Sequence, residues 1–86
     1  MPEISRFLGI VIRMFYSDHA APHFHAYYGD KMARVNIKTL AAMSSTLSPR
    51  VLGLVIEWAK IHQKALLTNW ERARQGRPLR KIEPLE

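Results

Sequence analysis

The hydrophobic pattern changes its period midway along the chain. Apolar residues alternate or run continuously up to residue 37, as in β-strands, and from residue 49 they recur every three or four positions, as in helices. Residues 40–46 alternate poorly and indicate either a weak fourth strand or a loop. The fold class predicted is α+β, an antiparallel sheet of three or four strands followed by two helices. The predicted strands cover residues 7–16, 23–28 and 31–37, the helices 49–62 and 64–75, and a tail 76–86.

The best-defined local feature is a hairpin. Gly29-Asp30 lies between two strand-like segments, and such a two-residue connection is typical of a tight reversal. Pairing Tyr28 with Lys31 fixes the register and places Phe24 and Ala26 on an apolar side. The opposite, polar side then pairs His23 with Asn36, His25 with Arg34 and Tyr27 with Met32.

The helical half carries clear start and stop signals. Ser48 is the expected N-cap and Pro49 the first helical residue, where its missing N–H costs nothing. Gly76 marks the expected C-terminal end of the helical region. A straight helix from Pro49 to Gln75 would be ~40 Å long, more than so small a domain can cover. We therefore expect a break between residues 62 and 64.

Length and charge narrow the possible partners. With 86 residues we expect a single domain, 1–86, whose thin core gains from a small partner protein or a homodimer. The net charge of +6 favours polyanions such as RNA, or an acidic protein. The apolar stretch 51–59 is far shorter than the ~20 residues of a membrane span, so no membrane partner is expected. The opening residues do not resemble a signal peptide, and we expect a cytoplasmic protein.

Histidines are the main candidates for chemistry. His19, His23 and His25 fall within a short segment, and imidazole transfers protons near neutral pH. If the hairpin forms, His23, His25 and Arg34 are candidate catalytic residues of a metal-independent ribonuclease, with Arg34 stabilising charge on phosphorus. Whether the chain is an enzyme stays open. His19, Tyr27 and Asn36 are candidate binding residues on the same side.

Two other interpretations of the histidines stay open. His23 and His25 point the same way from one strand, so with Asp18 or His19 they could share a metal. Alternatively, the rings bond to the backbone and cover the sheet. Our leading hypothesis is the phosphate-directed interpretation, and we expect no metal and no cofactor.

A basic stretch marks the end of the helical region. Such cations can complement a helix dipole, or they can bind a nucleic-acid backbone. The alternative function is therefore a non-catalytic binding module for DNA or an acidic protein partner, and a subunit with no site of its own is a third possibility. The candidate binding residues are Arg72, Arg74, Arg77, Arg80 and Lys81.

Several segments resemble a known family. The run Pro22-His-Phe-His-Ala, with residues 2–10, 57–59, 69–70 and 84–85, resembles a bacterial family of domains of unknown function. Its members are often encoded beside another small uncharacterised protein in a toxin–antitoxin-like arrangement. The resemblance implies a small antitoxin-like partner protein and supplies no catalytic residue. Together with the polar face of the hairpin and the positive charge, it leads to the hypothesis of a toxin-like component that binds or cleaves RNA. The chain departs from the family pattern at Ala21, where a proline is expected, and over residues 41–45, where the family is more acidic.

Overall fold

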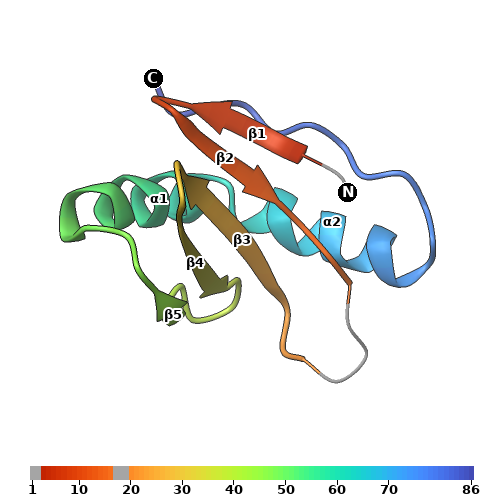
Figure 1. The fold of residues 1–86 in the computed structure, drawn as a ribbon. Helices are drawn as coiled ribbons and strands as arrows, with labels where there is room; N and C mark the ends of the chain where they lie inside the picture. Colours follow the sequence, from red (N-terminus) through yellow and green to blue (C-terminus); the bar gives the residue numbers. More distant parts are fainter. Residues whose placement is uncertain (1–2, 17–19) are drawn as a thin grey trace.

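A computed structural model describes residues 3–16 and 20–86. Five strands form one antiparallel sheet in which each strand pairs with the next along the chain. Two helices follow, and Figure 1 shows both on one side of the sheet. The elements are β1 (Glu3–Phe7), β2 (Ile10–Arg13), β3 (His23–Tyr28), β4 (Lys31–Asn36), β5 (Ala42–Ser45), α1 (Pro49–Ile61) and α2 (Gln63–Arg74). The α+β class is confirmed, with five strands where three or four were predicted.

The predicted strand over residues 7–16 is wrong, because the chain reverses inside it. Leu8 and Gly9 have φ angles of 51° and 80°, which is the left-handed backbone of a two-residue hairpin turn. The run therefore serves two strands, β1 and β2. The turn escaped detection because glycine and asparagine usually occupy such positions, whereas Leu8 continues the apolar pattern. Its side chain is 63% exposed.

The remaining predicted elements agree with the structure. Residues 42–45 form β5, which is a short and exposed edge strand. The Ser48 hydroxyl accepts a hydrogen bond from the Val51 N–H at 3.2 Å, and Pro49 begins α1. The helical region breaks at His62, as the length argument predicts. None of the helices in the described segments is long and apolar enough to cross a membrane.

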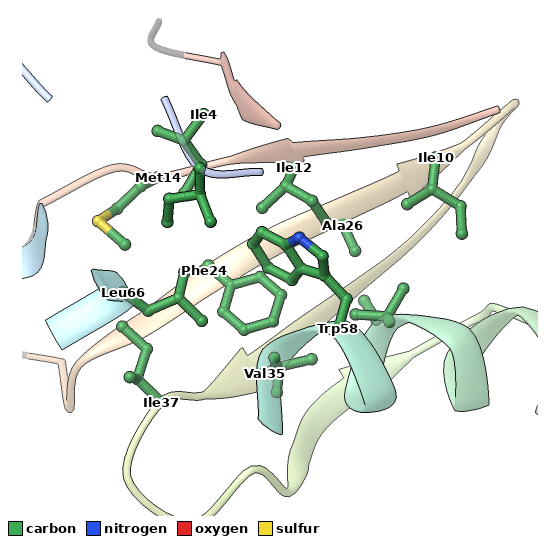
Figure 2. Packing of buried hydrophobic residues seen from close by; sticks show 14 of the residues in the cluster. Ile4, Ile10, Ile12, Met14, Phe24, Ala26, Val35, Ile37, Trp58 and Leu66 are labelled. Atoms are coloured by element: carbon green, nitrogen blue, oxygen red, sulfur yellow. The ribbon is translucent and has the colours of Figure 1, made fainter. Parts of the chain in front are cut away.

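One face of the sheet and the helices enclose the core. Trp58 of α1 lies at its centre beside Phe24 (Figure 2). Its ring centroid is 5.7 Å from that of Phe24 and 5.5 Å from that of Phe7. Leu66 of α2 is fully buried beside Ile37 and Phe24 (Figure 2). The helices therefore cover the core-facing residues of β1 to β4, whereas β5 is exposed on both faces and the opposite face of the other strands is mostly half-buried or exposed.

The C-terminal tail follows the edge strand β1 (Figure 1). The Ile82 N–H donates to the Ile4 carbonyl at 2.7 Å, and the Trp58 indole N–H donates to the Glu83 carbonyl at 2.8 Å. Asn69 of α2 bonds both the N–H and the carbonyl of Arg80. These bonds anchor the tail and shield an edge that would otherwise present unpaired backbone groups.

Candidate functional site

The hairpin of β3 and β4 has the predicted register. The cross-strand partners are His23 with Asn36, His25 with Arg34 and Tyr27 with Met32, and Gly29 makes the turn with a φ of 61°. These residues alternate with buried Phe24, Ala26, Ala33 and Val35, so they belong to the side of the sheet away from the helices. The hairpin therefore brings the candidate histidines and Arg34 onto one side.

We call this side of the sheet the open face. Its members are half-buried or exposed, in contrast to the buried positions with which they alternate. They come from the first four strands, with Phe15 added from the segment after β2. The open face consists of Arg6, Val11, Arg13, Phe15, His25, Tyr27, Met32 and Arg34.

His23 lies at the edge of the open face but is only 4% exposed. Its Nδ1–H donates to the Ala21 carbonyl at 2.8 Å, and its ring centroid is 5.3 Å from that of Trp70 on α2. The ring thus connects the start of β3 to α2. This burial leaves it almost no surface for exchanging a proton with a substrate, so the geometry does not favour the catalytic role predicted for His23.

His25 is the accessible imidazole of the pair. Its ring lies 4.8 Å from that of Phe15 and 5.3 Å from that of His23, measured between centroids. The pKa of His25 is lowered, first by burial and then by the charges of His23 and Arg34. The hydroxyl of Tyr27 lies 3.4 Å from Nδ1, while Nε2 is buried and has no hydrogen-bond partner. This environment favours the neutral form of the ring, and Nε2 is its nitrogen without a hydrogen-bond partner.

Arg13 is the residue that the sequence analysis did not assign to the site. It is the cross-strand partner of His25 in the β2–β3 register, and its guanidinium carbon lies 5.7 Å from the ring centroid of Tyr27. Its Nε is buried and has no partner. The sequence feature that could have pointed to Arg13 is that it is a single arginine inside an otherwise apolar strand. Its pairing with His25 could not be predicted, because no turn signal in the sequence fixes the register of β2 against β3.

Arg13, His25 and Arg34 form a continuous row across β2, β3 and β4, which we call the cationic row. Arg34 is exposed at one end, and Tyr27 and Phe15 present rings beside the middle of the row. Guanidinium groups match the geometry of phosphate oxygens, and aromatic rings stack on nucleobases. The arrangement can therefore bind a phosphorylated, base-bearing ligand.

Asn36 is engaged in a turn. Its side-chain oxygen accepts hydrogen bonds from the N–H groups of Lys38 and Thr39, at 2.8 and 3.0 Å. This is a local capping arrangement that begins the connection to β5. The side chain stabilises the backbone, so its oxygen is not free to bind a ligand.

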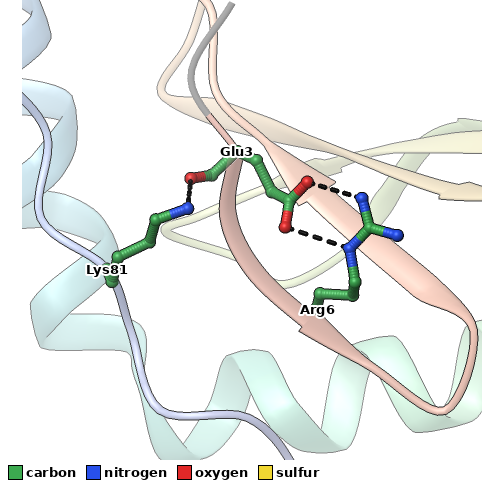
Figure 3. Close-up of polar contacts among 3 residues, drawn as sticks. All are labelled: Glu3, Arg6 and Lys81. Carbon is green, nitrogen blue, oxygen red and sulfur yellow. Dashed lines mark hydrogen bonds and ion pairs between the residues drawn. The ribbon is translucent and has the colours of Figure 1, made fainter.

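The basic stretch is partly occupied by bonds within the chain. The Arg72 Nε donates to the Pro78 carbonyl at 2.7 Å, and Arg74 pairs with Glu71. Lys81 donates to the Glu3 carbonyl at 2.8 Å (Figure 3). The pKa of Arg72 is lowered by desolvation and then by the nearby charges of Arg80 and Arg77. Both of these arginines are exposed; the side chain of Arg77 donates a long hydrogen bond to Gln75 at 3.4 Å, and Arg80 is held through its backbone by Asn69.

An ion pair lies at the margin of the open face. Glu3 accepts two hydrogen bonds from Arg6, at 2.7 and 3.1 Å, so the pKa of this carboxyl is lowered chiefly by that contact (Figure 3). Glu3 is also the cross-strand partner of Arg13, whose charge lowers the same pKa to a smaller extent. The Arg13 Nε itself has no hydrogen-bond partner.

Two candidates lie beyond what the structure describes. Asp18 and His19 fall outside the described residues, so the binding role of His19 stays a prediction. Within residues 3–16 and 20–86, no three His, Cys, Asp or Glu side chains gather into a group that could hold a metal ion.

Comparisons with known proteins give one result. No curated protein and no solved structure matches the chain significantly. A family model described as a domain of unknown function, DUF4160, matches residues 9–71, which include β2 to β5, α1 and most of α2. The cationic row lies inside the matched region. The chain therefore belongs to the DUF4160 family of domains of unknown function.

Proposed function

We propose that this protein binds single-stranded RNA on the open face of its sheet. The observation that carries the proposal is the cationic row, in which Arg13 and His25 each bury a nitrogen without a hydrogen-bond partner. A buried polar nitrogen left unpaired costs stability, and such exceptions in a native fold call for an explanation. A phosphate group on the row would first meet the exposed Arg34, and a small movement of the Arg13 and His25 side chains on binding would let its oxygens accept from the two buried nitrogens.

The rings beside the row favour a ligand with unstacked bases. Tyr27 and Phe15 flank His25, and stacking on such side chains contributes ~1–3 kcal/mol per base in single-strand binding. Bases inside a duplex are already stacked on each other and cannot use these rings. A sheet face with cations and rings interleaved therefore suits a single strand better than a double helix.

Binding is better supported than cleavage. Metal-independent cleavage needs one group to take a proton and another to give one, and both must reach the RNA. His25 reaches the open face, but His23 is buried against Trp70. We therefore propose binding as the primary activity. A toxin-like role with a small partner protein, which the family resemblance implies, would fit an RNA-binding component.

The test compares two exposed arginines that differ only in their location. Arg34→Gln removes a charge from the cationic row, and Arg50→Gln removes one from the first turn of α1. Fluorescence anisotropy with a labelled, mixed-sequence oligoribonucleotide should show about tenfold weaker binding for Arg34→Gln, and near wild-type binding for Arg50→Gln. If Arg34 contacts one phosphate, its loss should also reduce the salt slope by roughly 0.7.

Two other outcomes would contradict the proposal. Equal losses for Arg34→Gln and Arg50→Gln would mean that only net charge matters. A loss confined to Arg80→Gln would assign binding to the basic stretch. Gel analysis of the same RNA after incubation separates cleavage from binding, and we expect the RNA to remain intact.

A further inference from the structure

Helix α1 is apolar on nearly all sides. Of its 13 residues only Arg50, Glu57 and Lys60 are charged, and its core side is already used by Val55 and Trp58. A helix that is hydrophobic all round is normally buried on all sides. The outward surface of α1 nevertheless forms a shallow groove open to solvent, in which Ile61 is 64% exposed. The groove is lined by Leu52, Gly53, Ile56, Glu57, Lys60 and Ile61.

Gly53 lies in the middle of this groove and has no structural reason to be glycine. It is helical, and a Cβ added there would meet no atom within 4 Å. Glycine weakens a helix interior relative to alanine, because it loses more backbone entropy on folding. Its remaining advantage is that another backbone can approach closely at that point.

We propose that the groove binds the same groove of a second copy of this chain, with the two α1 helices antiparallel about a two-fold axis. In that arrangement Glu57 of one copy faces Lys60 of the other, and the contact occurs twice because the interface is self-complementary. Neither side chain takes part in an ion pair elsewhere in the described parts of the chain. In the same register Ile56 of one copy packs against Ile61 of the other, so both apolar side chains are buried.

The charges of the groove favour a second copy over an acidic partner. The groove contains one acid and one base, so its charges match those of its own copy turned by the two-fold axis. A uniformly acidic surface would place its carboxylates against Glu57. Only two of the thirteen Lys and Arg residues belong to α1, so the net charge of +6 is not concentrated at this interface.

The proposed interface and the open face lie on opposite sides of the molecule. Because α1 covers the sheet face opposite to the cationic row, pairing through α1 leaves both open faces accessible. The dimer would therefore present two outward-facing sheets. The inference of a dimer does not depend on what those sheets bind.

Sedimentation velocity of the full chain over a range of concentrations tests the interface. We expect a monomer–dimer equilibrium that Ile61→Lys shifts to monomer. Met43→Lys is the matched control, because Met43 is also a large exposed apolar residue but lies on β5. A monomer at every concentration, or a dimer that tolerates Ile61→Lys, would overturn the proposal.

Two further sets of variants test the arrangement itself. Glu57→Lys and Lys60→Glu should each weaken the dimer about tenfold, while the double swap should restore it. Gly53→Ala should raise the thermal stability of the diluted monomer and weaken the dimer, whereas a purely local role would raise both. Circular dichroism of each variant verifies the fold, and failure of the double swap to restore pairing would reject the antiparallel geometry.

Discussion

Arg13 of β2 and His25 of β3 are cross-strand partners, and each buries one side-chain nitrogen that has no hydrogen-bond partner. The Arg13 guanidinium also lies over the ring of Tyr27, 5.7 Å from its centroid. Leaving these two buried nitrogens without a hydrogen-bond partner lowers the stability of the unbound protein. An anion bound between them offsets that cost, which links the local geometry to the proposed binding of RNA.

The affinity for RNA should increase as the pH falls. The groups facing His25 are His23, Arg13, Arg34 and Tyr27, none of which is a carboxylate, so the pKa of the free ring is lowered chiefly by burial. A bound phosphate favours the protonated ring and raises this pKa. Anisotropy titrations at about pH 7.5 and 5.5 should show tighter binding at the lower pH.

The control is histidine replacement at two positions. His25→Gln should remove most of the pH dependence, and His62→Gln, between the helices, should preserve it. If His25→Gln keeps the pH dependence, protonation of His25 does not contribute to RNA binding.

The stability of the free protein should change in the opposite direction with pH. Because the pKa of His25 is lowered in the folded state, the unfolded chain binds this proton more readily. The contribution of the neutral ring is complete above the ordinary pKa of ~6.5 and is lost as the pH falls through the folded value. Urea unfolding at several pH values should show this loss, and His25→Gln should show less of it.

The turn between β1 and β2 can be made more stable. Leu8 has a φ of 51°, a conformation that costs most L-residues ~1–2 kcal/mol but that asparagine tolerates. Leu8→Asn should raise the free energy of unfolding by about 1 kcal/mol, since the exposed leucine loses little packing. Leu40 also has a positive φ but packs against the core, so Leu40→Asn should give no such gain. Equal effects in urea titrations would contradict this explanation.

A buried side-chain amide holds the tail at Arg80. Asn69 is 1% exposed and bonds both backbone groups of Arg80, at 2.8 and 2.9 Å. Asn69→Ala leaves those groups without partners and should cost ~1–3 kcal/mol. Hydrogen exchange at the Arg80 amide should accelerate in this variant and stay slow in Thr68→Ala, an exposed neighbour. Slow exchange in both would show that other contacts hold the tail.

Local signals predicted the parts of the fold that depend on neighbouring residues. Gly29-Asp30 gave the register of β3 and β4, and Ser48 with Pro49 gave the start of α1. The turn at Leu8 was missed because its apolar side chain continues the strand pattern. As a result, the sequence placed one strand where the structure has two.

The full set of site residues could not be predicted from the sequence, because some of them come together only through contacts between distant segments. His25 and Arg34 were placed together because one hairpin carries both. The burial of His23 was not predictable in this way, because it requires Trp70 from α2 to pack against the start of β3. Arg13 joined the site only through the pairing of β2 with β3, which no turn signal in the sequence specified.

The central claim is that the open face is the surface that contacts RNA, and NMR titration tests it most directly. Amide and side-chain shifts of the labelled protein are followed as an unlabelled single-stranded oligoribonucleotide is added. The account predicts that the largest changes occur at Arg13, His25, Tyr27 and Arg34. Changes confined to Arg77 and Arg80, or to the groove of α1, would contradict it.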